Sequence, residues 1–470
     1  MLPTKGNQLV KSLQRSLLIH SNKLVSAAVP LTDPLPDAPS QHVPRIVHRD
    51  VKITQLENGI KVATVDNGGA VSRLCVALRG GSRNETSTQF GLSHLLKNAA
   101  FITNKERTDL RTVRELQQIG GTLECKSSRE LISRNAVFMR HKLLELLENM
   151  APGITQPIFN AWDLSDVIEG CQFENAIVYT DPNAVNLELL HQAAFRSGLG
   201  NSLYCENFRL GCYSPEQLEE YVQQMHVGER LTIVGTDVDH DELLRYVKEL
   251  FGNLPRGQIL HNTTQKYFGG EIHRNTGVDL TYVSLVTEGA GLFHANLPVL
   301  AVLQRILGSG PNVKWGSNQA SSRINKAATA VTDGPLLINT LNISYSDAGL
   351  FGVNIITTPQ AATPVLKAAV GQITAVAKGD VTAKEFERAK TQAKAAASMQ
   401  SESNDDMLDD LVQQIAFHGR YTPLKESLAN IDKVTLEETS KLTKHLLNGK
   451  ASLAVTGDSS AAPYIDQLFI

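Results

Sequence analysis

The residue types that could perform chemistry in this chain lie close together in the stretch GLSHLLKNAAF, residues 91–101. When a helix carries H-x-x-E-H, the two histidines face one zinc ion and the glutamate activates zinc-bound water. The corresponding residues here are His94, Lys97 and Asn98. A lysine ammonium repels a divalent cation and cannot accept a proton from water, and an asparagine amide is a poor zinc ligand. The stretch therefore predicts a helix with the layout of a zinc site but without its base or second histidine.

A single histidine on a helix is more often structural than metal-binding, so the motif by itself leaves that interpretation open. The elements around the helix are more informative. SRLCVALRGGSR predicts a strand and glycines before His94, and RELQQIGGTLECKSSRELISRNAVFM predicts a helix that ends at Gly120-Gly121. Two strands follow, with a turn at Ser127-Ser128. Helices combined with antiparallel strand pairs predict an α+β fold.

The second part of the chain repeats this order, which predicts an internal duplication. LTYVSLVTEGAGLFHANLPVLAVLQRIL again predicts a strand, glycines and a helix. FGVNIITTPQAATPVLKAAVGQI predicts a strand followed by a helix, with Thr363 as N-cap and Pro364 at the first helical position. The stretches that begin at Ser214 and Thr435 each predict a hydroxyl-capped helix with acids in its first turn.

Size and composition agree with two globular domains. A chain of 470 residues is too long for one hydrophobic core. The net charge of −3 gives no electrostatic argument for nucleic-acid binding, and no apolar run approaches the ~20 residues that span a bilayer. Five cysteines without a C-x-x-C pair suit a reducing compartment. Residues 253–277 are rich in Gly, Pro, Asn and Thr. We therefore expect one domain over residues 46–255, an interdomain linker over 256–270, and a second domain over 271–470.

The N-terminal residues differ from the rest of the chain. Residues 1–30 contain lysines and an arginine but no acid, and Leu9, Leu13 and Leu17 recur every four residues. This basic amphipathic pattern is typical of a mitochondrial transit peptide, and an ordinary basic arm is the alternative. A proline-rich linker is predicted over residues 31–45.

Several stretches resemble the mitochondrial processing peptidase family of inverted zinc metallopeptidases. They are GSRNETSTQFGLSHLL, GGTLECKSSREL, LHQAAFRSGLGNSLYCENFRLG, GSGPNVKWGSN and NISYSDAGLFG. The resemblance extends from about Val51 to the end of the chain. It implies two homologous α+β domains arranged as a clam-shell, each with a mainly antiparallel sheet. It also implies that Glu174 stands where the family's third zinc ligand would be, so that His94, Lys97, Asn98 and Glu174 mark a vestigial zinc site with no catalytic or metal-binding residue.

Within this family, the chain resembles the core subunits of respiratory complex III. The resemblance implies a non-catalytic subunit on the matrix side of the inner mitochondrial membrane. Its implied partners are core protein 1, cytochrome b, cytochrome c1 and the Rieske iron–sulfur subunit. The hemes and the iron–sulfur cluster would be held by other subunits, so we expect no cofactor on this chain and membrane association only through partners.

One loop leaves a second function open. GSGPNVKWGSN contains Gly308, Gly310 and Gly316, and it loosely resembles the glycine-rich loop with which the non-catalytic subunit of the processing peptidase engages presequence peptides. Pro311 and Trp315 interrupt the glycines, and a plain connection after the helix LAVLQRIL is the alternative. The second hypothesis is therefore a substrate-recognising, non-catalytic peptidase subunit that binds a presequence peptide.

Overall fold

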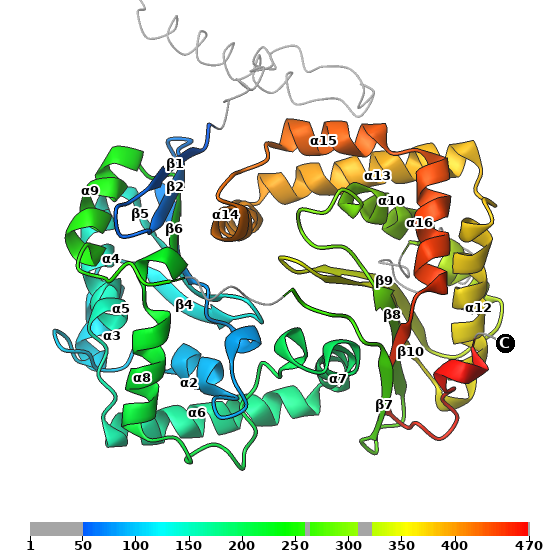
Figure 1. Ribbon diagram of the computed structural model, residues 1–470, viewed down its shortest axis with the longest axis horizontal. Helices are drawn as coiled ribbons and strands as arrows, with labels where there is room; N and C mark the ends of the chain where they lie inside the picture. The colour runs from blue at the N-terminus through cyan, green and yellow to red at the C-terminus, as the bar shows by residue number, and fades with distance from the viewer. Residues whose placement is uncertain (1–49, 259–263, 309–321, 469–470) are drawn as a thin grey trace, which may run out of the picture. The chain divides into compact units, whose positions relative to one another are not determined.

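A computed structural model of the chain describes residues 50–258, 264–308 and 322–468. The predicted transit peptide (1–30) and proline-rich linker (31–45) lie outside these residues. The described residues form one compact unit. It contains a six-stranded and a five-stranded sheet with helices packed on them, which confirms the predicted α+β fold (Figure 1).

The first half of the described chain, residues 50–258, builds the six-stranded sheet. Its strands lie in the order β1-β2-β6-β3-β5-β4, and only the β2–β6 pair is parallel. The strands are β1 (Lys52–Gln55), β2 (Lys61–Val65), β3 (Val71–Leu78), β4 (Thr122–Ser127), β5 (Ile132–Met139) and β6 (Leu231–Thr236). The helices are α2 (Leu92–Asn98), α3 (Asp109–Gln118), α4 (Leu143–Met150), α5 (Pro152–Thr155), α6 (Ala161–Thr180), α7 (Pro182–Phe195), α8 (Pro215–Met225) and α9 (His240–Phe251).

The second half, residues 264–468, repeats this arrangement. Its sheet has the order β7-β11-β8-β10-β9, and only the β7–β11 pair is parallel. The strands are β7 (Gly270–Asn275), β8 (Thr281–Glu288), β9 (Leu336–Ser344), β10 (Gly349–Thr357) and β11 (Ala451–Gly457). The helices are α10 (Leu297–Leu307), α11 (Arg323–Thr329), α12 (Pro359–Ala377), α13 (Ala383–Glu402), α14 (Asn404–His418), α15 (Leu424–Lys433) and α16 (Leu436–Asn448). The order matches β2-β6-β3-β5-β4 strand by strand, as a duplicated half requires. The predicted domain limits and the clam-shell shape stay predictions.

Most of the predicted helix starts and turns are present. Ser214 and Thr435 each close a capping box, and Gly120 has a φ of 67° after α3. The predicted start of α12 is wrong: the helix begins at Pro359 after Thr358, and Pro364 lies inside it. The Thr363 hydroxyl donates to the carbonyl of Ala461 instead of capping the helix. Strand β10 ends at Thr357, and the helix follows it immediately. The earlier Thr-Pro pair, Thr358-Pro359, therefore forms the start of the helix.

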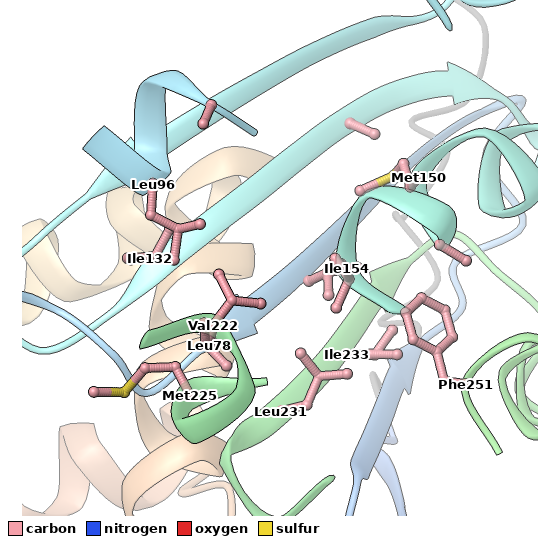
Figure 2. Close-up of a cluster of buried hydrophobic side chains, with 14 of the residues drawn as sticks. Leu78, Leu96, Ile132, Met150, Ile154, Val222, Met225, Leu231, Ile233 and Phe251 are labelled. Atoms are coloured by element: carbon pink, nitrogen blue, oxygen red, sulfur yellow. The ribbon is translucent and has the colours of Figure 1, made fainter. Parts of the chain in front are cut away.

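Each sheet packs one face against helices of its own half. In the first half, Leu74, Val76 and Ile233 of the sheet are buried against Leu95 of α2 and Leu146 of α4. Figure 2 shows part of this core, with Leu96 near Ile132 and Phe251 near Ile233. The second half buries Val283, Val353 and Val455 against α10 and α12 in the same way.

The other face of each sheet is covered by a helix from the opposite half. Helix α14 packs against β3 and β6 and buries Leu408, Leu411 and Ile415 there. Helix α7 packs against β7, β8 and β11, and its Asn186 hydrogen-bonds to Ser284 in the second sheet (Figure 1). Because the two halves exchange a helix, neither one contains every element that covers its own sheet.

A buried ionic cluster also joins the halves, and we call it the Arg83 cluster: Arg83, Glu130, Ser346 and Asp347. Glu130 lies between β4 and β5, and Ser346 and Asp347 lie in the equivalent turn between β9 and β10. The Arg83 guanidinium contacts Glu130 Oε1 at 2.6 Å and both oxygens of Asp347 at 2.7 and 2.6 Å. The backbone N–H of Ser346 donates to Glu130 Oε2 at 2.9 Å.

Within the ranges described, every helix is too short or too polar to span a lipid bilayer.

Candidate functional site

The predicted site lies where α2 crosses α6, and a buried carboxylate fixes the start of α2. Gly91 precedes the helix with a φ of 93°, and a Cβ there would lie 2.4 Å from the Cys205 sulfur, so only glycine fits. Glu85 accepts hydrogen bonds from the backbone N–H groups of Gly91 at 2.9 Å and Ser93 at 2.7 Å. Burial raises the pKa of Glu85 to about 7 against these bonds. Glu85 thereby supplies the capping acceptor that the N-cap glycine lacks.

Helix α6 presents Glu174 to α2. Leu164, Val167 and Cys171 anchor one face of α6 in the first core. The Asn175 side chain donates to the carbonyl of Cys205 at 2.7 Å, which fixes the loop after α7 against α6. This fixation matters because the same loop contacts His94.

His94 is buried, and its two ring nitrogens have different roles. The backbone N–H of Cys205 donates to Nδ1 at 3.2 Å, so Nδ1 must be the unprotonated acceptor. Nε2 lies 2.9 Å from Glu174 Oε2, where the neutral ring donates a hydrogen bond to the carboxylate. The Tyr204 ring packs edge-on against the imidazole at a centroid distance of 5.6 Å. The surroundings of His94 therefore select the tautomer that donates to Glu174.

Lys97 and Asn98 also donate to Glu174. The Lys97 ammonium lies 2.5 Å from Oε1, and the Asn98 amide lies 3.2 Å from Oε2. The Asn98 amide is also 3.2 Å from the Cys171 sulfur. Hydrogen bonds from His94, and then from Lys97 and Asn98, lower the pKa of Glu174 to about 2 despite partial burial. The carboxylate is therefore ionised at neutral pH, and both of its oxygens are occupied by donors.

This geometry can hold two helices together but offers little to a cation. Zinc needs the lone pair of an imidazole nitrogen, and here Nε2 carries the proton while Nδ1 accepts from the backbone. The Lys97 ammonium is paired with Glu174 Oε1, where it would repel a divalent cation bound to the same carboxylate, and it cannot act as a base. Among the described residues, no group of three or more His, Cys, Asp and Glu side chains is arranged to hold a metal ion.

The structure brings together all four residues predicted for this site, which are His94, Lys97, Asn98 and Glu174. Only one of the three glycines predicted for the glycine-rich loop lies within the described residues. Gly308 ends α10 with a φ of 82°, close against Ser322, whereas Gly310 and Gly316 lie outside the described residues.

Several contributors to the site were not predicted from the sequence, among them Glu85, Cys171 and Cys205. Cys171 precedes Glu174 by three residues, so helical spacing could have placed both on one face of α6. Glu85 and Cys205 gave no local signal, because they reach α2 from separate loops.

Comparison with known proteins gives the family. A model described as "Insulinase (Peptidase family M16)" matches residues 61–207, and one described as "Peptidase M16 inactive domain" matches residues 213–393. The chain is 32% identical to "Cytochrome b-c1 complex subunit 2, mitochondrial" of Homo sapiens over 420 residues, which cover 89% of this chain and 92% of that protein. It is 28% identical to the protein of the same name in Neurospora crassa over 87% of this chain and 89% of that protein. It is 26% identical to "Mitochondrial-processing peptidase subunit alpha" of Solanum tuberosum over 94% of this chain and 89% of that protein. With both halves matched and such similarity over nearly the whole of a relative, the chain belongs to peptidase family M16.

Proposed function

We propose that this chain is a non-catalytic core subunit of mitochondrial respiratory complex III, equivalent to core subunit 2, with a degenerate zinc-peptidase site. The contact between Lys97 and Glu174 carries the chemical part of the proposal. In an H-x-x-E-H enzyme, the residue at position 97 would be the carboxylate that removes a proton from water. Here that residue is a cation 2.5 Å from the carboxylate that would bind the metal.

The residues at this site do not fit a zinc ion. Binding at His94 Nε2 would require the ring to lose its hydrogen bond to Glu174 or to change tautomer against the Cys205 N–H. Binding at Glu174 would require displacement of the Lys97 ammonium. A divalent cation at Glu174 and the Lys97 ammonium would be two like charges on the same carboxylate, and they would repel strongly in this partly buried site. The two cations therefore exclude each other. The site therefore serves as a structural link between α2 and α6.

The similarity to cytochrome b-c1 complex subunit 2 supports the assembly role. In this role the chain is a peripheral mitochondrial protein on the matrix side of the inner membrane. It associates with that membrane through its partner subunits. It pairs with core protein 1, and the assembly contains cytochrome b, cytochrome c1 and the Rieske subunit. The hemes and the iron–sulfur cluster belong to those other subunits, and this chain binds no cofactor or nucleic acid.

Native sizing of detergent-solubilised inner membranes tests this role, with mass spectrometry of the proteins that comigrate. The expected result is that the chain migrates with the cytochrome b and cytochrome c1 subunits. Recovery of the chain only in a heterodimer with a zinc-bearing subunit would contradict the assembly role.

A second candidate is a substrate-recognising, non-catalytic subunit of the mitochondrial processing peptidase. The similarity to processing peptidase alpha subunits over 94% of the chain supports it. This role predicts that the chain binds a presequence peptide and stimulates cleavage by a zinc-bearing partner. Cleavage assays with and without the chain separate the two candidates, because complex III membership alone predicts no stimulation.

A further inference from the structure

Helix α6 has an outward face with the pattern of a helix-packing seam. Trp162, Asp166, Glu169 and Phe173 follow one another at steps of four, three and four residues, and Ile177 follows four residues later. This spacing places them in one stripe along the helix. Trp162 and Phe173 are each 70% exposed and Ile177 is 54% exposed. We call these five residues the α6 stripe.

The opposite face of α6 is already buried. Leu164, Val167, Cys171 and Asn175 lie on that face, where α2 and α7 pack (Figure 1). A surface helix normally has one apolar face and one polar face, whereas a helix with apolar residues on opposite faces is typical of a buried position. The α6 stripe therefore has the composition of a surface that another element covers.

The charges on α6 restrict what can cover it. Residues 161–180 contain Asp163, Asp166, Glu169 and Glu174 but no lysine, arginine or histidine. Glu174 is paired with Lys97, whereas neither Asp166 nor Glu169 has an ion-pair partner in the part of the chain that the structure describes. Both lie in the middle of the stripe, between the two aromatic side chains. An apolar partner would bury these carboxylates unpaired, which is costly, so the partner must supply cations there.

This pattern disfavours two other occupants. A second copy of the chain placed stripe to stripe would bring four carboxylates together, and they would repel one another. A membrane with anionic lipids would repel the same carboxylates, whereas surfaces that bind such membranes are basic.

We propose that the α6 stripe docks an amphipathic helix of a partner protein, with lysine or arginine opposite Asp166 and Glu169 and apolar residues at both ends. The stripe from Trp162 to Ile177 is about 22 Å long, which matches roughly four turns of such a helix. Aromatic anchors at the ends with charge pairing between them would fix its register. This proposal does not depend on the proposed function, because it requires only that some partner helix has this chemistry.

Fluorescence of Trp162 tests the proposal directly. The full chain contains two tryptophans, so Trp315→Phe leaves Trp162 as the one reporter. The probes are two synthetic amphipathic peptides of equal length, one of leucine and lysine and one with every lysine replaced by glutamate. The leucine–lysine peptide should shift Trp162 emission to shorter wavelength in a saturable manner, and the leucine–glutamate peptide should not. Raised salt should weaken the binding because it screens the charges.

Charge reversal provides the decisive comparison. Asp166→Lys combined with Glu169→Lys should invert the preference between the two peptides. Phe173→Ala should weaken binding of the basic peptide about tenfold or more. Met399→Ala is the matched control, because this side chain on α13 is 68% exposed but lies outside the stripe. These side chains are on the surface, so thermal unfolding should confirm that the variants fold.

Four results would overturn the proposal: equal binding of both peptides, no inversion by the double reversal, an unchanged Trp162 emission, or an emission shift with anionic phospholipid vesicles instead of the basic peptide. Self-association in sedimentation experiments that Phe173→Ala abolishes would also overturn it, because the stripe would then bind a second copy.

Discussion

Removal of the Arg83 guanidinium should destabilise the chain far more than removal of an exposed ion pair with the same geometry. The Arg83 side chain is 3% exposed and contacts Glu130, which is 7% exposed, and Asp347, which is 27% exposed. Arg83→Met would leave the buried Glu130 carboxylate without its direct cationic partner. Breaking a buried ion pair in this way costs about 3–5 kcal/mol. The Arg79 guanidinium remains close enough to Glu130 to offset part of this cost, so we expect about 3 kcal/mol, at the lower end of that range.

Arg140→Met is the matched control. Arg140 and Asp66 also form two hydrogen bonds of 2.6 Å, but their side chains are 36% and 35% exposed. Solvent screens this pair, so its loss should cost about 0–1 kcal/mol. Urea unfolding followed by circular dichroism measures both variants, provided that each unfolds in one transition with an unchanged slope.

A double-mutant cycle separates the ion pair from other effects of the substitution. Glu130→Gln removes the carboxylate that Arg83→Met strands, so the double variant should lose less stability than the sum of the two single variants. If Arg83→Met costs no more than Arg140→Met, burial does not govern the contribution of the Arg83 cluster to stability, and this result would refute the prediction. Additivity of Arg83→Met and Glu130→Gln would also refute it.

Three other predictions concern the site and the exchanged helix. Hydrogen bonds from His94, Lys97 and Asn98 hold the folded-state pKa of Glu174 at about 2, below its ordinary value of 4.5. These bonds therefore stabilise the fold above pH 4.5, and the stabilisation is lost as the pH falls toward 2. Glu174→Gln should therefore lower the Tm at pH 7 by an amount that shrinks in acid, and a deficit that stays constant with pH would contradict this. Lys97→Glu combined with Asn98→His should give a chain that retains stoichiometric zinc after dialysis, as measured by metal analysis. Neither single variant should retain zinc, and a metal-free double variant would mean that other residues block the site. Leu411→Ala on α14 should cost about 2–5 kcal/mol in urea unfolding because it opens a cavity against the first sheet, whereas Leu110→Ala, which is 73% exposed, should cost less than about 0.5 kcal/mol; equal effects would mean that α14 does not stabilise that sheet.

Local chemistry made much of the secondary structure predictable. A serine or threonine before acids caps a helix whatever surrounds it, so the starts at Ser214 and Thr435 could be predicted. Gly120 similarly marks the end of α3 because only glycine tolerates its backbone conformation well. The Thr-Pro pairs at 358–359 and 363–364 are locally equivalent, and the end of β10 decided between them.

At the candidate site, too, some features follow from the local sequence and others depend on distant residues. Helical spacing put His94, Lys97 and Asn98 on one face, and their residue types alone excluded a water-activating base there. The tautomer of His94 could not be predicted, because it depends on the backbone N–H of Cys205, 111 residues away. The capping of α2 by Glu85 also depends on a loop whose sequence carries no capping pattern.

Chain connectivity and charge type are local properties, so the residue order was enough to predict the duplicated α+β halves and the missing base. The partners of α7 and α14 were decided only when the chain folded, because an apolar helix face fits any apolar sheet and its sequence does not specify which one. The Arg83 cluster has the same origin: Glu130 meets Ser346 across 216 residues because equivalent turns of the two halves face each other, and Arg83 bridges Glu130 and Asp347. Pairwise contacts between distant residues depend on the packing of the whole unit, and no local pattern encodes them.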